Sequence, residues 1–251
     1  MEKTIIEVKD ISMRFNLEQE RTDTIKEYFM KLLKKQLKYN DFYALRDVSF
    51  NVMRGEAVAL VGVNGSGKST LLKIISGVIA PTNGYVVSKG SIAPLIELGA
   101  GFDTELTARE NIYLNGAVLG HSREFMDKHF EEIIEFSELK DFINVPIKNF
   151  SSGMTARLGF AIATIVDADI LVVDEVLAVG DYGFQKKCKT RMKELMGNGT
   201  TVLFVSHSIE TVRSICQKAV WLDHGRVVAY GEVNKICDKY VEFIENKDNN
   251  R

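Results

Sequence analysis

The chain has 251 residues, of which 45% are hydrophobic and 26% are charged, and its formal net charge is -2. This length and ordinary composition allow a well-buried core, whereas the near-neutral charge argues against an overall basic surface for nucleic acid. No apolar run approaches the roughly 20 residues that a membrane-crossing helix needs, and the amino terminus lacks the apolar region of a secretory signal.

Cysteine and proline usage narrows the class of protein further. Cys188, Cys216 and Cys237 are widely spaced and include no CxxC pair. We therefore expect reduced thiols in a cytoplasmic protein, rather than a disulfide framework or a zinc site. Three prolines and the lack of a low-complexity linker favour a single domain over residues 1–251.

Short apolar runs rich in β-branched residues alternate with helical patterns along the chain. Residues 5–15 and 44–56 are typical of strands in an antiparallel flank, and residues 219–232 read as a hairpin. Three other runs are near-continuous in apolar residues, as strands covered on both faces must be. Each ends in polar or glycine residues, where an open α/β sheet places its ligands, so we predict an α/β fold with an antiparallel flank. The three runs are residues 56–63, 168–175 and 200–207.

The segment GVNGSGKST, residues 62–70, fits the pattern GxxxxGK[ST] in full. It follows a predicted strand and opens a predicted helix over residues 69–79, which is the context that this motif requires. Glycines let the backbone curl so that successive N–H groups converge on phosphate oxygens. Lys68 supplies a charge for the β- and γ-phosphates, and the Ser69 hydroxyl can bind Mg²⁺. The predicted triphosphate-binding residues are Gly62, Asn64, Gly65, Ser66, Gly67, Lys68, Ser69 and Thr70.

A helical insert in the α/β core is predicted at about residues 98–150. The stretch TARE fits a capping box, in which Thr107 caps a helix and Glu110 reaches back to it. Further residues recur at helical spacing and mark one face of a second helix. They are Phe125, Met126, His129, Phe130, Ile133 and Ile134.

The stretch FSSGM, residues 150–154, places two serines and a glycine in front of an apolar, helix-like run. The first N–H groups of a helix lack partners within the helix, so such a start suits an anion. Ser151, Ser152 and Gly153 therefore form a second candidate phosphate site.

Two carboxylates, Asp174 and Glu175, end a predicted strand. Asp174 is placed to hold Mg²⁺, and Glu175 to polarise a water in line with the γ-phosphate as general base or orienting group. His207 ends another strand, where its imidazole can meet the same phosphate. A solvated strand-end acid and a structural histidine are the alternatives, but the ligand edge of the sheet favours catalysis for both.

Taken in order, GVNGSGKST, FSSGM, ILVVDE and VSH resemble the motifs of the ATP-binding cassette (ABC) ATPases, over nearly the whole chain. FSSGM stands where that family has its signature LSGGQ. Ser151 and Gly153 match the signature, whereas Phe150, Ser152 and Met154 depart from it. The resemblance implies that two copies pack head to tail, so that the signature of one closes on ATP held by the other. It thus implies a homodimer with ATP and Mg²⁺ as cofactors.

Three further positions follow from the resemblance. Asp181 matches the aspartate of the family's D-loop, which acts across the dimer interface; as an alternative, or in addition, it caps a helix that begins at Tyr182. By spacing, Phe15 is the aromatic residue that stacks on adenine, although an apolar residue near a strand end can equally belong to the core. Glu97 stands near the place of the Q-loop glutamine. A Mg²⁺ contact of its carboxylate is an open alternative there, and a hinge to the helical insert is expected.

Residues 96–116, 150–163 and 174–188 together look like ATPase subunits that export polysaccharides such as O-antigen, teichoic acid and capsule. In those systems a separate membrane-spanning permease moves a lipid-linked glycan, with two ATPase copies at the cytoplasmic face of the membrane and no nucleic acid. The alternatives are the ATPase of another transporter, such as an importer, or a soluble cassette ATPase that acts on ribosomes or nucleic acid. Glu175 and His207 argue against a catalytically silent regulator.

An insert at about residues 24–39 has the pattern of a basic amphipathic helix. Apolar side chains form one stripe, and Lys31, Lys34, Lys35 and Lys38 lie mostly opposite. Such a helix can lie on an anionic membrane or against a permease. We favour the commoner explanation, in which the stripe packs on its own domain and the lysines are solvated.

Overall fold

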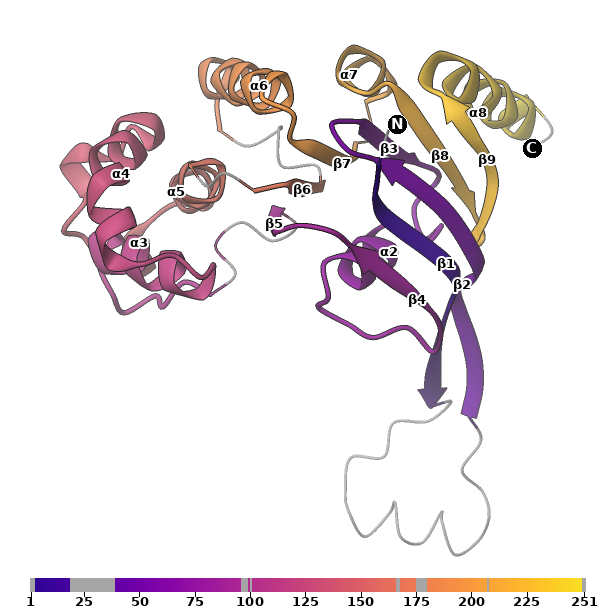
Figure 1. The fold of residues 1–251 in the computed structure, drawn as a ribbon, viewed down its shortest axis with the longest axis horizontal. Coiled ribbons are helices and arrows are strands. Elements are labelled where there is room, and N and C mark those ends of the chain that lie inside the picture. The colour runs from indigo at the N-terminus through magenta and orange to yellow at the C-terminus, as the bar shows by residue number, and fades with distance from the viewer. Residues whose placement is uncertain are drawn as a thin grey trace, which may run out of the picture.

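A computed structural model describes residues 3–18, 39–95, 99, 101–165, 168–174, 180–206 and 208–249. These residues form two β-sheets and a set of helices (Figure 1). The strands are β1 (Thr4–Glu18), β2 (Tyr39–Met53), β3 (Ala57–Val61), β4 (Asn83–Ser88), β5 (Ile92–Leu95), β6 (Ile170–Asp174), β7 (Thr201–Val205), β8 (Lys218–Asp223) and β9 (Arg226–Glu232). The helices are α2 (Lys68–Ile75), α3 (Ala108–Val118), α4 (Arg123–Ser137), α5 (Ser152–Thr164), α6 (Tyr182–Gly197), α7 (Ile209–Ile215) and α8 (Val233–Asn249), with 3-10 turns η1 (Lys140–Phe142) and η2 (Ile147–Asn149).

The two sheets differ in direction and in role. One has three strands in the order β2-β1-β4, all paired antiparallel, and the other has six in the order β5-β6-β7-β3-β8-β9. In the second sheet β5, β6, β7, β3 and β8 run parallel, and β9 pairs antiparallel with β8. The predicted α/β fold with an antiparallel flank is confirmed. Because parallel strands share a direction, their carboxyl ends meet at one edge of the sheet.

The six-stranded sheet is covered on both faces, which is why its central strands are apolar throughout. In β3, the side chains of Ala57, Ala59 and Val61 belong to a core cluster shared with α6, α7 and α8. Val58 and Leu60 belong to a second cluster, shared with α2 and the antiparallel sheet. Figure 1 shows these helix groups on opposite sides of the sheet. The alternation follows from the period of two residues in a strand.

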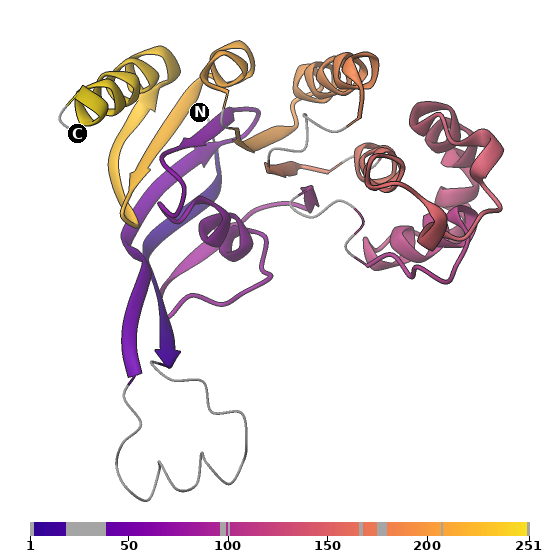
Figure 2. The ribbon, with the colours of Figure 1, turned by 180° about the vertical axis from the view of Figure 1, so that it is seen from behind.

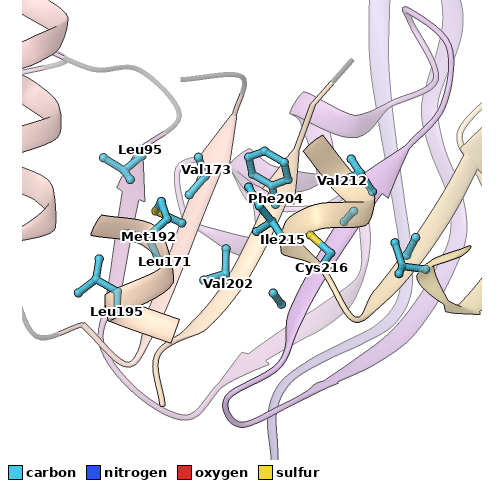
Figure 3. Close-up of a cluster of buried hydrophobic side chains, with 14 of the residues drawn as sticks. Leu95, Leu171, Val173, Met192, Leu195, Val202, Phe204, Val212, Ile215 and Cys216 are labelled. Atoms are coloured by element: carbon cyan, nitrogen blue, oxygen red, sulfur yellow. The ribbon is translucent and has the colours of Figure 1, made fainter. Parts of the chain in front are cut away.

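Figure 3 shows the first of these clusters, in which β5, β6 and β7 lie against α6 and α7. Every labelled side chain in it is less than a tenth exposed. The labelled residues are Leu95, Leu171, Val173, Met192, Leu195, Val202, Phe204, Val212, Ile215 and Cys216.

The helix that follows the glycine-rich loop is shorter than predicted. We expected residues 69–79, but α2 spans Lys68–Ile75. Gly77 is left-handed, with φ of 73°. The Val78 N–H donates back to the Lys73 carbonyl at 2.9 Å, and the Gly77 N–H donates to the Ile74 carbonyl at 3.0 Å. This pair of bonds is the Schellman motif, which ends a helix at a left-handed glycine.

The predicted helical insert lies to one side of the sheets in both views (Figures 1 and 2) and has a core cluster of its own. The predicted capping box is present, because the Thr107 hydroxyl accepts the Glu110 N–H and the Glu110 carboxylate accepts the Thr107 N–H at 2.8 Å. Of the predicted face on α4, Met126, Phe130, Ile133 and Ile134 are buried. Phe125 and His129 are half-buried, and their rings contact each other at a tilt of 42°. The cluster also takes in Leu158 and Ile162 of α5.

The predicted hairpin is confirmed as β8 and β9. Asp223 pairs with Arg226, so His224 and Gly225 form a two-residue turn with φ of 45° and 76°. The Gly225 N–H donates to the Ser66 carbonyl at 3.1 Å, so this turn contacts the glycine-rich loop directly.

The predicted amphipathic helix at 24–39 lies outside the described residues, apart from Tyr39, which belongs to β2. Among the helices that the structure describes, none is both long and apolar enough to cross a membrane.

The three cysteines are free and buried, in keeping with the predicted reduced thiols. Burial raises the pKa of Cys188 and of Cys216 to about 12, so both stay neutral and unreactive near pH 7.

Replacing Phe160 by alanine tests the packing between α5 and the rest of the molecule. Phe160 is fully buried, and its ring lies 5.7 Å from that of Phe136 and 6.4 Å from that of Phe184. We expect Phe160→Ala to lower the free energy of unfolding by about 3–5 kcal/mol, because it removes the ring and leaves a cavity. Val118→Ala, at an α3 position that is 67% exposed, is the control and should change it by less than about 0.5 kcal/mol. Urea titration followed by circular dichroism measures both, and equal effects would contradict this account of the core.

Candidate active site

The glycine-rich loop joins β3 to α2 and curls tightly because glycines occupy its points of close approach. Gly67 has φ of 103°, and a Cβ there would lie 2.6 Å from the Ala44 carbonyl oxygen and 2.7 Å from Leu45 Cδ2. A Cβ at Gly62 would collide with the Leu222 carbonyl. Only glycine fits either position, so the backbone of the loop packs directly on β2 and β8.

The loop presents positive charge to the space above it. Gly67 is the N-cap of α2 and has no side chain with which to satisfy the N–H groups of the first turn. The Lys68 side chain is buried, and its Nζ donates to the carbonyls of Gly62 at 2.7 Å and Val63 at 2.9 Å. Burial lowers the pKa of Lys68, while the charge of Asp174 acts in the opposite direction.

A cleft of about 290 Å³ lies over this loop. It brings together the helix start, the ends of β6 and β7, and the β1–β2 ribbon. Of the predicted loop residues, Gly62 and Ser66 do not line the cleft; Ser66 is buried, and its hydroxyl has no partner within the described residues. The lining residues are Phe15, Phe42, Ala44, Asn64, Gly65, Gly67, Lys68, Ser69, Thr70, Asp174 and Val205.

Two oxygen ligands for a divalent cation meet in this cleft. The Ser69 hydroxyl comes from the first turn of α2, and the Asp174 carboxylate from the end of β6. Hard cations such as Mg²⁺ take oxygen ligands of these types, usually few from the protein and the others from water and phosphate. The residues present therefore fit Mg²⁺.

Glu97, Glu175 and His207 lie outside the described residues. Asp174, which precedes Glu175, pairs with Val205 of the adjacent strand, and both line the cleft.

Two aromatic residues on neighbouring strands line the cleft. Phe15 of β1 pairs directly with Phe42 of β2, and their side chains are 38% and 49% exposed. Directly opposite residues in an antiparallel pair project from the same face, so both side chains extend from one face of the ribbon. Phe15 therefore lines the cleft and does not belong to the core. Sequence reasoning missed Phe42, because only the register of β1 on β2 identifies it.

The signature segment forms the amino terminus of α5. Ser151 is the N-cap, and its Oγ accepts the Met154 N–H at 3.2 Å, which leaves the hydroxyl proton free to be donated. Ser151 and Ser152 are exposed. None of the residues Ser151, Ser152 and Gly153 lines the described cleft.

Asp181 is the N-cap of α6, as one alternative predicted. Its Oδ1 accepts the Phe184 N–H at 3.0 Å, and its Oδ2 accepts an Arg157 N–H at 2.6 Å. The Phe184 N–H holds the pKa of Asp181 below its usual range, and Arg157 acts in the same direction.

Comparison with known proteins now identifies the family. A family model described as ABC transporter matches residues 45–178. The O-antigen export system ATP-binding protein RfbB of Klebsiella pneumoniae is 49% identical over 83% of this chain and 85% of its own length. The chain belongs to the ABC transporter family. The teichoic acids export ATP-binding protein TagH of Listeria innocua is 45% identical over 96% of this chain and 70% of its own length. The predicted resemblance of this ABC ATPase to subunits of polysaccharide exporters is confirmed.

Solved structures agree with this ABC assignment. The ATP-binding subunit of an ABC transporter superposes with a TM-score of 0.75 and 26% identity, over 94% of this chain and 93% of its own. A dimeric ATP-binding cassette with ADP and phosphate superposes with a TM-score of 0.72 over 91% of this chain and 98% of its own, and at 24% identity it supports the fold alone.

Replacing Phe42 by alanine tests whether this ABC ATPase uses the aromatic pair for the base of the nucleotide. We expect Phe42→Ala to weaken ATP binding about three- to tenfold, which corresponds to the loss of one stacking contact. Binding of inorganic triphosphate should be unchanged, since it has no base. Tyr43→Ala is the control, because Tyr43 is also partly exposed, at 36%, but faces the other side of the ribbon. Calorimetric titration measures all three proteins, and equal losses for Phe42→Ala and Tyr43→Ala would contradict the assignment.

Proposed function

We propose that this chain is the ATP-hydrolysing subunit of an exporter that moves a lipid-linked polysaccharide, such as O-antigen or teichoic acid, across the cytoplasmic membrane. The observation that carries the proposal is 49% and 45% identity, over most of the chain, to subunits named for O-antigen and teichoic acid export. A separate membrane-spanning permease carries the glycan. Two copies of this chain sit as a peripheral pair on the cytoplasmic face.

The described cleft supports the binding of ATP in a defined orientation. The N–H groups of the loop and of the first turn of α2, together with Lys68, receive the phosphates. Phe15 and Phe42, which line the same cleft, receive the adenine. Ser69 and Asp174 would hold Mg²⁺, which when bound neutralises charge on the phosphates.

Hydrolysis needs a group that handles the attacking water, and the strand ends supply the candidates. Glu175 follows Asp174 in the sequence and orients or deprotonates the water. His207, two residues after β7 in the sequence, contacts the γ-phosphate. Glu97 lies in the segment that joins the core to the helical insert and serves as a hinge there.

The signature segment completes the site in a second copy of the chain. Ser151, Ser152 and Gly153 carry a helix start and a free hydroxyl proton, both suited to phosphate, yet they do not line the cleft of their own chain. A head-to-tail dimer brings this segment onto ATP held by the partner. ATP then joins the two copies, and its hydrolysis loosens them.

Mixing two inactive variants tests this shared site. Lys68→Ala disables the loop that binds the phosphates, and Ser151→Arg disables the signature, so each variant alone should be inactive. An equal mixture should recover about a quarter of wild-type turnover, because half of the dimers are mixed and each has one intact site. Phosphate release measures turnover. An inactive mixture would contradict a site shared between chains.

Purification of the full chain from detergent-solubilised membranes tests the transport function. We expect a small membrane-spanning permease to copurify, and we expect cells without this chain to lose a surface glycan, measured by electrophoresis of cell-wall and lipid-linked polysaccharide. Copurification of ribosomes with an unchanged surface glycan would overturn the proposal.

A further inference from the structure

Arg157 connects two exposed segments that are far apart in the sequence, the signature segment at Ser151 and the segment at Asp181. It stands on α5, six residues after Ser151, and its side chain is only 18% exposed. One terminal nitrogen donates to Glu138 Oε2 at 2.8 Å, and the other to Asp181 Oδ2 at 2.6 Å. Its guanidinium also lies over the Phe184 ring, 4.7 Å from the ring centre. The group is thus held from three sides.

These contacts join the middle of α5 to the end of α4 and to the start of α6. Glu138 is the left-handed residue that closes α4, with φ of 61°, and Asp181 is the N-cap of α6. Arg157 itself belongs to the helix that Ser151 opens. The Arg157 side chain therefore ties together three elements: the signature helix α5, the end of α4 and Asp181 at the start of α6.

Neighbouring residues support the contacts of Arg157. Lys187 of α6 donates to the other oxygen of Glu138 at 3.2 Å and to the Phe136 carbonyl at 2.9 Å, so Glu138 is held from two sides. Gly180 has φ of 78°, and a Cβ there would lie 3.1 Å from the Phe184 ring and 3.4 Å from Arg157 Nε. Glycine at this position lets the chain pass close over the guanidinium.

The two segments that Arg157 connects are exposed to solvent. Ser151 is exposed, the Asp181 side chain is 70% exposed, and Tyr182 is 84% exposed. Because both carboxylates face water, these ion pairs add little to folding stability. Their geometry is specific, however, since the fork of a guanidinium can bond two carboxylates at once and an ammonium cannot match it.

We infer that Arg157 is a positioning residue that locks the signature segment to Asp181, so that both reach the partner's nucleotide as one rigid unit. The inference rests on the head-to-tail dimer of the proposed function. It adds that one side chain couples the two segments that a chain contributes to its partner. A small displacement of groups at a reacting centre can cost a large factor in rate, so loss of this coupling is expected to lower turnover more than stability.

Arg191 provides a matched control. It joins the same three helices, donating to Glu132 at 3.0 Å and to the Thr164 carbonyl at 3.1 Å, and its side chain is 24% exposed. Thr164 is the last residue of α5, at the end opposite to Ser151. Arg157→Met and Arg191→Met therefore remove comparable contacts, the first at the middle of α5 and the second at its end.

The single variants are compared first. Arg157→Met should lower kcat about tenfold or more while KM for ATP and ATP binding change less than twofold, and Arg157→Lys should restore little of the loss. Arg191→Met should keep kcat within about twofold, and both methionine variants should lower the melting temperature by similar amounts. A fall in kcat that is equal for Arg157→Met and Arg191→Met would overturn the inference.

Adding Arg157→Met to one or the other chain of a mixed dimer then distinguishes a positioning role from a general loss of structure. In the mixture of Lys68→Ala and Ser151→Arg chains, the intact site takes its signature from the Lys68→Ala chain. Arg157→Met should lower the recovered turnover about tenfold or more when it is added to the Lys68→Ala chain and spare it when added to the Ser151→Arg chain. If both placements lower the recovered turnover equally, the positioning role of Arg157 is overturned, while the shared site still stands. An inactive parent mixture instead overturns the shared site, and the inference falls with it.

Discussion

The close packing of three backbone segments without side chains between them is the constraint on which the site depends. A Cβ at Gly67 or at Gly225 would lie 2.6 Å from the same atom, the Ala44 carbonyl oxygen, and a Cβ at Gly62 would strike the Leu222 carbonyl. The glycine-rich loop, the β8–β9 turn and the start of the core part of β2 are thereby fixed against one another. Hydrogen bonds from Gly225 to Ser66 and from Arg46 to Gly225 hold the same junction.

This junction also sets where the aromatic pair stands. Phe42 precedes Ala44 by two residues, and Phe15 is its direct partner on β1. Because Ala44 is pinned to the loop, the two rings stand at a fixed place relative to Lys68 and Ser69, which line the same cleft. A ligand that carries both negative charge and an aromatic ring matches this lining.

Two candidate phosphate-binding features stand in separate places of the molecule. The loop, Lys68 and Asp174 form one, in which burial and the neighbouring carboxylate act on the pKa of Lys68 in opposite directions. The start of α5 forms the other, and it stands outside the first cleft. Arg157 connects this second place to Asp181, which follows β6 and so is attached to the chain that forms the first. The fold thus keeps the glycine-rich loop and the start of α5 apart within one chain, while the Arg157–Asp181 contact links the two regions.

The amino-acid sequence alone predicted those features that depend on residues close together in the chain. Buried strands, the capping box at Thr107, the hairpin turn and the glycine-rich loop follow from steric and hydrogen-bonding preferences within a few residues. Glu97, Glu175 and His207 rest on the sequence alone. Only the tertiary structure decided the partner of Phe15, because the register of β1 on β2 shifts at several bulges between Val8 and Arg14. It also decided the contacts of Arg157, whose partners stand 19 and 24 residues away, because such contacts depend on how whole helices pack.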